Sequence, residues 1–188
     1  MKYPKPIKKI VHGSKYFVLK QIYPSHILVD WSKRLNNFGD ILNPYIIRNL
    51  SSKKIINVRS DYCNSEHLLA IGSVLDRATK SSVIWGSGFI SEESRFIAAP
   101  KKVMAVRGPK TRQLLMNQNI ECPEIFGDPA LLLPGIFKKE ISKKYEIGII
   151  PHYIDKNNNW LKPVSQSVNI IDLQDPNPLN VIEQILQC

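Results

Sequence analysis

The feature that most constrains the fold is a regular alternation of short apolar segments, rich in β-branched residues, with segments of helical spacing. The apolar segments are bounded by turn residues and are too short for ordinary helices, so we predict strands there. Strands so rich in apolar residues, alternating with helices, predict a Rossmann-like, doubly wound parallel sheet covered on both faces. The predicted strands are 26–31, 53–58, 67–72, 82–86, 102–106, 124–128, 144–150 and 168–173. The predicted helices are 40–50, 109–119 and 177–188, with a short helix or turn over 129–137.

Charge is distributed unevenly along the 188 residues, whose net charge is +10. From Tyr145 onward two basic and five acidic residues give −3, so residues 1–144 carry +13. A basic first part favours anionic partners: nucleic acid, phosphorylated metabolites or an acidic membrane surface. We interpret the scattered lysine pairs as solubilising surface. Because basic residues do not form a stripe interleaved with aromatics, no nucleic-acid partner is expected.

The cysteine pattern and the hydropathy of the sequence indicate the cellular compartment of the protein. Cys63, Cys122 and Cys188 are widely spaced, without the pattern of a disulfide framework or a metal site, which fits a reducing cytoplasm. No apolar run reaches membrane-spanning length, and the basic N-terminus is not followed by a signal-peptide segment. We therefore expect a cytoplasmic protein without a bound metal.

A domain boundary is predicted near residues 134–144, where a polar stretch follows a Pro-Gly pair and the charge changes sign. Residues 1–137 are long enough for a complete N-terminal Rossmann-like domain. Residues 145–188 are too few to bury an independent core. They either pack onto the first domain or begin a second Rossmann-like domain that is incomplete in this chain.

Several glycines fall where predicted strands end, among them Gly86, Gly88 and Gly108. Each one by itself is explained by a tight turn between a strand and a helix. In open parallel sheets, however, ligands bind beyond the carboxyl ends of the strands, where glycine lets backbone approach closely. Together with Arg107 and Asp128, these glycines predict a ligand cleft. The WGSGF segment lacks the third glycine of a dinucleotide fingerprint, so a dinucleotide cofactor is not expected.

Three polar positions allow both a structural and a chemical interpretation. Asp40 closes the NNFGD turn, where it either caps a helix or offers a carboxylate to a hydroxyl group or sugar. Asp128 allows the same two interpretations. His152 follows a strand and a proline, a setting that lines clefts, although a lone histidine is more often structural.

Seven segments, taken in order, resemble the polysaccharide pyruvyltransferase family. They are NNFGDILNPYIIRNL, AIGSVL, VIWGSGFI, VMAVRGPKTRQLL, FGDPALLLP, IGIIPHYID and VIEQILQC, and they cover the chain from Asn36 onward. The resemblance implies transfer of the enolpyruvyl unit of phosphoenolpyruvate to a sugar, which forms a pyruvate ketal across two hydroxyls. Phosphoenolpyruvate is then the donor substrate, and no cofactor is implied. The acceptor is a sugar or lipid-linked oligosaccharide of a surface glycan or exopolysaccharide precursor.

The resemblance also implies roles for individual residues. Asp40 acts on the acceptor hydroxyl, and Arg107 anchors the donor anion at a helix start, where free N–H groups add positive potential. The alternative for Arg107 is an internal ion pair with a carboxylate such as Asp128. The further substrate-binding residues expected are Asn37, Gly39, Gly86, Gly88, Gly108, Asp128 and His152.

The implied architecture is the glycosyltransferase-B arrangement of two Rossmann-like halves. Members of the family continue into a Ser-x-His segment, whereas this chain ends at Cys188, so we expect the first half and the opening of the second. Peripheral association with the inner face of the membrane is expected, and the oligomeric state stays open. Two other functions remain: a nucleotide-sugar glycosyltransferase of the same fold, and a non-enzymatic binder of anions or nucleic acid.

Overall fold

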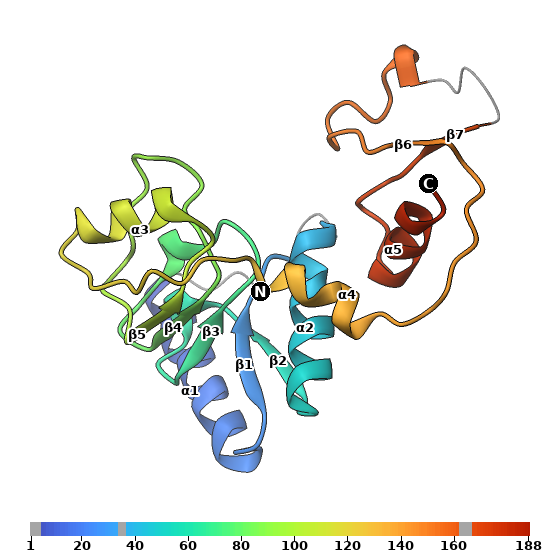
Figure 1. Cartoon of the computed structure of the whole chain (residues 1–188). Helices are drawn as coiled ribbons and strands as arrows, with labels where there is room; N and C mark the ends of the chain where they lie inside the picture. The colour runs from blue at the N-terminus through green and yellow to red at the C-terminus, as the bar shows by residue number, and fades with distance from the viewer. Residues whose placement is uncertain (1–4, 34–36, 162–166) are drawn as a thin grey trace. The chain divides into compact units, whose positions relative to one another are not determined.

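A computed structural model describes residues 5–33, 37–161 and 167–188 (Figure 1). The chain forms two compact units. The first consists of Met1–Trp31 and Asn43–Ile136, and the second of Ser32–Leu42 and Phe137–Cys188. Helix α2 (Phe38–Ser51) contributes its beginning to the second unit and its remainder to the first.

The first unit is built on a five-stranded, fully parallel sheet with the strand order β2-β1-β3-β4-β5. The chain passes from β1 outward to β2 and returns across β1 to β3, so its winding direction reverses between β1 and β3. This order confirms the predicted α/β class with a parallel sheet. It also places the carboxyl ends of all five strands at one edge. The strands are β1 (Ile27–Asp30), β2 (Ile55–Val58), β3 (His67–Leu69), β4 (Ser82–Trp85) and β5 (Lys102–Ala105).

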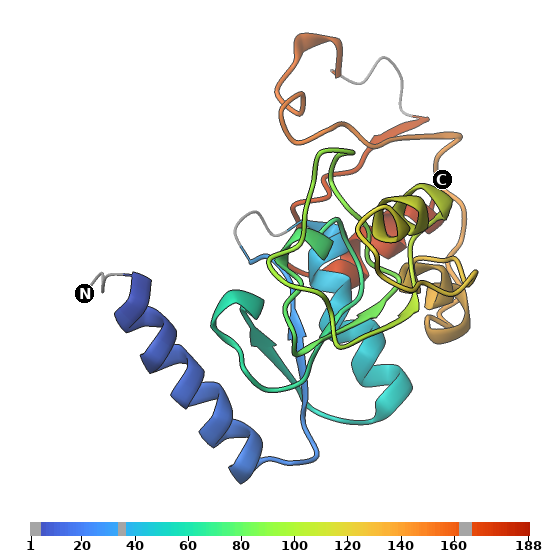
Figure 2. The ribbon, with the colours of Figure 1, turned by 90° about the vertical axis from the view of Figure 1, so that its left-hand side faces the viewer.

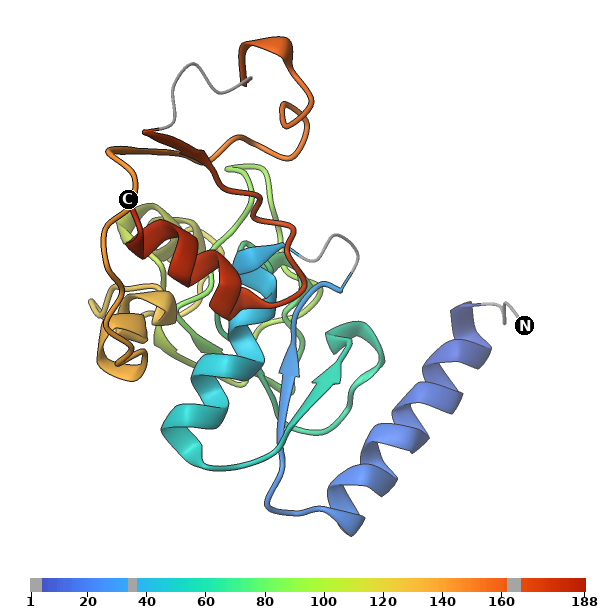
Figure 3. The same cartoon turned by 90° about the vertical axis from the view of Figure 1, so that its right-hand side faces the viewer.

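Alternating side chains of the strands build a core on each face of this sheet. On one face Val29 packs with Ile47 of α2. On the other, Leu28 packs with Tyr16 of α1 (Lys5–Ile22), and Ile84 packs in a cluster with Leu115 of α3 (Pro109–Met116). Figure 3 shows α1 and α2 on opposite sides of β1 and β2.

Two parts of the first unit differ from the sequence prediction. Helix α1 was not predicted, because its sequence mixes lysines with apolar residues and contains Gly13. The predicted strand 124–128 is reduced to one parallel bridge between Val106 and Phe126. Gly127 has a φ of 150°, and Pro129 follows at the start of the next helix, so the extended backbone ends there.

Short helices replace long crossovers elsewhere in the first unit. One lies between β2 and β3, one between β3 and β4, and two follow β5. These elements are the 3-10 helices η1 (Ser60–Tyr62), η2 (Leu75–Arg77) and η3 (Pro129–Leu132), and the single-turn helix α4 (Leu133–Ile136).

The second unit contains a two-stranded parallel sheet of β6 (Ile147–Ile149) and β7 (Val168–Ile170). It is followed by helix α5 (Pro178–Leu186), and the 3-10 helix η4 (Asn159–Leu161) lies between the strands. A Cβ at Gly148 would lie 2.8 Å from the sulfur of Cys188, so only glycine fits there without a shift. The division into domains 1–137 and 145–188 stays a prediction.

The buried His67–Ser82 pair generates a prediction about pH. Ser82 Oγ accepts the N–H of Thr79 (2.9 Å), so its own hydrogen is available to His67 Nε2 (2.8 Å). His67 Nδ1 lies 2.9 Å from the carbonyl of Ser65 and carries the proton of a neutral ring. Burial lowers the pKa of His67 below its usual value.

As the pH falls through about 6.5, unfolded His67 therefore takes up a proton before the folded ring does, and stability is lost. Urea unfolding at about pH 7.5 and about pH 5.5 should show a larger loss of unfolding free energy in the parent than in His67→Gln. Equal losses in the two proteins would mean that His67 does not contribute to acid sensitivity.

Candidate functional site

The loops that follow β3, β4 and β5 meet at the carboxyl edge of the five-stranded sheet and are bonded to one another. The N–H of Gly88, after β4, donates to the carbonyl of Gly72, after β3 (3.2 Å). The N–H of Arg107, after β5, donates to the carbonyl of Ser87 (3.2 Å). These bonds join the three loops into one platform.

Arg107 is held on this platform by two neutral groups. Its Nη1 donates to Ser73 Oγ at 2.7 Å, and its Nη2 donates to the carbonyl of Phe89 at 2.9 Å. Among the residues that the structure describes, Arg107 takes part in no ion pair. The guanidinium has five N–H donors. It is therefore fixed in position by neutral groups while its side chain stays exposed.

The glycines around Arg107 have packing reasons that involve the protein itself. Gly86 has a φ of 91°, and a Cβ there would lie 2.3 Å from Pro129 Cδ. A Cβ at Gly88 would lie 2.8 Å from Cζ of Arg107, so the guanidinium occupies the space that a side chain would need. Contact of these glycines with a ligand stays a prediction.

Gly108 leaves the beginning of helix α3 open. Pro109 is the first residue of α3, and Gly108 precedes it without a side chain that could cap the helix. Within the described residues, no atom outside its chain neighbours lies within 4 Å of a Cβ built at Gly108. Space and a helix start are thus present directly beside Arg107 in the sequence, an arrangement that favours an anion.

Asp128 lies near this site but does not pair with Arg107. Its Oδ1 accepts the N–H of Ala130 at 2.9 Å and so caps η3. Partial burial raises the pKa of Asp128, while the Ala130 bond and the charge of Arg107 act in the opposite direction. The alternative of an Arg107–Asp128 ion pair is therefore not found, because Asp128 is engaged with the start of η3.

Four of the predicted site residues belong to the second unit. Asn37 lies just before α2, and its Oδ1 accepts the N–H of Gly39 at 3.0 Å. Asp40 lies inside the first turn of α2, and its Oδ1 accepts the N–H of Ser32 at 3.2 Å. The capping interpretation of Asp40 does not hold, because α2 begins two residues before it. His152 follows β6, is exposed, and contacts the ring of Tyr153 in a tilted arrangement with 4.3 Å between centroids. Its ligand role stays a prediction.

The structure thus gathers the predicted site residues in two groups. Gly86, Gly88, Arg107, Gly108 and Asp128 belong to the first unit. Asn37, Gly39, Asp40 and His152 belong to the second, where the N–H of Phe38 donates to the carbonyl of Leu173 at 2.9 Å. The start of α2 is thereby attached to the segment that follows β7.

Sequence reasoning missed two residues that shape the Arg107 site. Ser73 binds the guanidinium directly, and no sequence signal distinguishes it from other loop serines. Asn43 is fully buried; its Nδ2 donates to the carbonyl of Ile71 at 3.1 Å, and its Oδ1 accepts the N–H of Ile71 at 3.0 Å. This two-way clamp fixes the backbone just before Gly72. A polar residue on the otherwise apolar side of helix 40–50 was the available signal.

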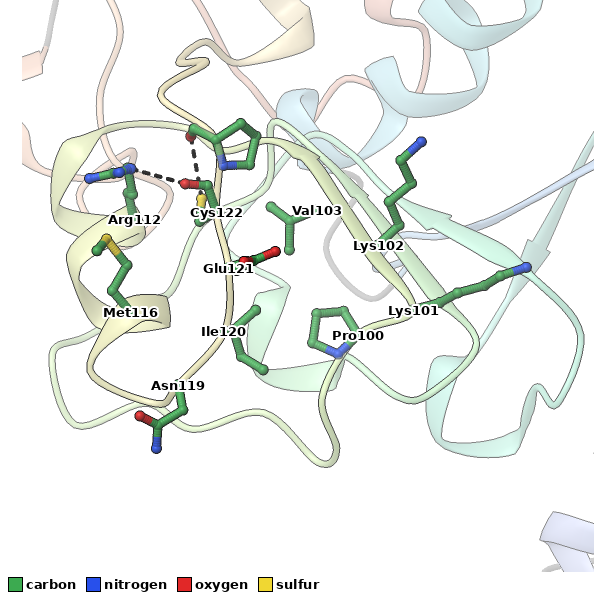
Figure 4. Close-up of a pocket in the computed structure, with 11 residues that line it drawn as sticks. Pro100, Lys101, Lys102, Val103, Arg112, Met116, Asn119, Ile120, Glu121 and Cys122 are labelled. Carbon is green, nitrogen blue, oxygen red and sulfur yellow. Dashed lines mark hydrogen bonds between the residues drawn. The ribbon is translucent and has the colours of Figure 1, made fainter.

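A cavity of about 1000 Å³ lies elsewhere in the first unit, beside β5 and α3 (Figure 4). Arg112 lines it and donates from Nε to the carbonyl of Cys122 at 3.0 Å. Burial raises the pKa of the Cys122 thiol, which keeps this group protonated and unreactive. None of the predicted site residues lines this cavity. Its walls are formed by Pro100, Lys101, Lys102, Val103, Arg112, Met116, Asn119, Ile120, Glu121, Cys122 and Pro123.

The described ranges also bear on metal binding and on membrane spanning. Within them, His, Cys, Asp and Glu side chains form no cluster of three that could hold a metal ion. No helix in that part of the chain is both long and apolar enough to cross a bilayer.

Comparison with known proteins decides the family. The model of the family described as polysaccharide pyruvyl transferase matches residues 7–188. The chain belongs to this family. The match confirms the resemblance drawn from the seven segments and extends it upstream into α1. The family's description names a pyruvyl transferase, and the match does not favour the nucleotide-sugar alternative.

One relative is an uncharacterized protein of Acanthamoeba polyphaga mimivirus. It is 32% identical over 176 residues, which cover 90% of this chain and 59% of the relative. The chain therefore spans about three fifths of the length of that protein. No solved structure gave a significant match.

The Asn43 clamp predicts a specific stability effect. Asn43→Leu leaves the N–H and the carbonyl of Ile71 without partners, at a cost of roughly 1–3 kcal/mol for each buried group. Asn49→Leu is the matched control, because Asn49 lies on the same helix and its side-chain bond to the Tyr45 carbonyl is exposed. Denaturant unfolding should show a large loss of unfolding free energy for Asn43→Leu. The unfolding free energy of the control should change by no more than about 0.5 kcal/mol. Similar losses in both variants would contradict the clamp.

Proposed function

We propose that this chain binds phosphoenolpyruvate and belongs to a pyruvyltransferase that forms pyruvate ketals on a sugar of a surface glycan or exopolysaccharide precursor. The observation that carries the proposal is the exposed guanidinium of Arg107, which Ser73 and Phe89 hold and which forms no ion pair within the described residues. Membership in the polysaccharide pyruvyl transferase family supports the reaction class.

The donor suits this site chemically. Phosphoenolpyruvate carries a phosphate and a carboxylate, and a planar guanidinium bonds either through two parallel N–H donors. The start of α3 adds backbone N–H groups and the positive end of a helix dipole. Because Ser73 and Phe89 are uncharged, binding a donor anion does not require breaking an internal ion pair.

The proposed reaction forms one C–H bond and two C–O bonds on the donor. A proton adds to the methylene carbon of phosphoenolpyruvate, and the electron pair of the double bond forms the new C–H bond, which leaves a cationic carbon at C2. A sugar hydroxyl attacks C2 and loses its proton. The bond between C2 and the phosphate oxygen then breaks, inorganic phosphate leaves with the electron pair, and a second hydroxyl attacks C2, loses its proton to the phosphate and closes the ketal. The products are the ketal and phosphate. A negative group near C2 stabilises the cationic stage.

Asp40 is proposed to accept the proton of the attacking hydroxyl. A carboxylate can act as such a general base when it lies within hydrogen-bond reach of the hydroxyl. Its position in the first turn of α2, bonded to the N–H of Ser32, orients the side chain. The resemblance places the acid for the methylene carbon in a Ser-x-His segment that follows the helix matching residues 181–188, so the experiment below measures donor binding rather than turnover.

The second unit fits a glycosyltransferase-B arrangement as part of the same proposal. Two parallel strands followed by a helix are the beginning of a Rossmann-like unit. The strands β6 and β7 and the helix α5 supply these parts in the expected order. We propose that they open the second Rossmann-like domain.

Titration of phosphoenolpyruvate into the parent, Arg107→Lys and Arg112→Lys tests the donor site. A charge-assisted arginine contact contributes roughly 1.5–3 kcal/mol, so Arg107→Lys should weaken binding about tenfold to a hundredfold. An ammonium cannot make the two-pronged contact. Arg112→Lys is the control, because Arg112 pairs with Glu124 at 3.2 Å and lines the separate cavity.

Melting curves of the same proteins separate binding from stability. If Arg107→Lys binds phosphoenolpyruvate as the parent does but melts at a lower temperature, Arg107 has only a structural role. The donor-site proposal would then be wrong.

A further inference from the structure

Helix α1 presents large apolar side chains to solvent. Tyr16 is buried against the sheet, whereas Phe17, Val18 and Ile22 are 58%, 50% and 60% exposed. Tyr23, just after the helix, is 45% exposed. Figure 2 shows this helix at the margin of the first unit. Large apolar side chains therefore share the exposed side of this helix with Ser14, Lys15 and Gln21, whereas an ordinary surface helix exposes mainly polar residues.

The sequence repeats this apolar spacing earlier in the helix. Val11 precedes Val18 by seven residues, and Ile7 precedes it by eleven. Both intervals are close to whole numbers of turns at 3.6 residues per turn. The apolar spacing thus runs along most of the length of α1.

The charged residues of the segment that contains α1 all have one sign. Asp30 is the first acidic residue of the chain, and it lies beyond the helix. Six basic residues precede it: Lys2, Lys5, Lys8, Lys9, Lys15 and Lys20. A partner for this region must therefore accept apolar side chains and carry negative charge. Helices with these two properties lie in the interface of anionic membranes.

We propose that α1 attaches the protein to an anionic lipid surface, with Phe17, Val18 and Ile22 inserted at the boundary between headgroups and acyl chains. Lysines of the same segment, such as the exposed Lys15, contact the negative headgroups. A second copy of the chain is a poorer occupant, because it would bring two lysine-rich segments together. Attachment places the protein where a lipid-linked acceptor would be found. It does not depend on the Arg107 site, and either proposal can fail by itself.

Flotation with lipid vesicles tests the attachment. The whole chain should float with phosphatidylcholine vesicles that contain phosphatidylglycerol, and less with phosphatidylcholine alone. Added salt should weaken the binding. The triple variant Phe17→Ser, Val18→Ser, Ile22→Ser should bind at least about tenfold more weakly, since three apolar side chains no longer leave water.

The matched control is Ile90→Ser with Leu131→Ser, because both side chains are 74% exposed and lie outside α1. The control should bind vesicles as the parent does, and melting curves should show that each variant is folded. If the parent fails to bind anionic vesicles at low salt, or if the triple variant binds as the control does, the proposal is wrong. Self-association that the triple variant abolishes, without vesicle binding by the parent, would instead assign this face to a second copy and also overturn it.

Discussion

The hydrogen bonds that fix Arg107 are the interaction on which the candidate site depends. Ser73 Oγ and the carbonyl of Phe89 come from loops after different strands, so one side chain ties the carboxyl edge together. An internal carboxylate would hold the arginine equally well but would cancel its charge. Neutral partners hold the guanidinium and leave its charge for a ligand, which is the physical basis of the donor proposal.

The parallel sheet makes this arrangement possible. Because all five strands point the same way, the loops that carry Ser73, Phe89 and Arg107 emerge at the same edge. Asn43 of α2 fixes the first of these loops by bonding both backbone groups of Ile71. A buried polar residue in a helix thus supports a site on the neighbouring loop, and its own role is packing and orientation rather than chemistry.

Local patterns predicted much of this structure, and long-range contacts account for what they missed. The strands β1 to β5 follow from β-branched segments between turns, and the position of Arg107 follows from a strand end before a proline-started helix. Helix α1 was missed because its sequence mixes lysines with apolar residues and contains Gly13, so it lacks the pattern of an ordinary surface helix. The roles of Ser73 and Asn43 depend on partners 34 and 28 residues away, which spacing cannot reveal.

The most direct test of the central claim is the side-chain NMR spectrum of the arginines while phosphoenolpyruvate is added. We expect the Nε–H resonance of Arg107 to move progressively and to saturate, while that of Arg112, already bonded to the Cys122 carbonyl, stays in place. A stationary Arg107 resonance at donor concentrations that shift another arginine would contradict the account, because the donor anion would then bind elsewhere.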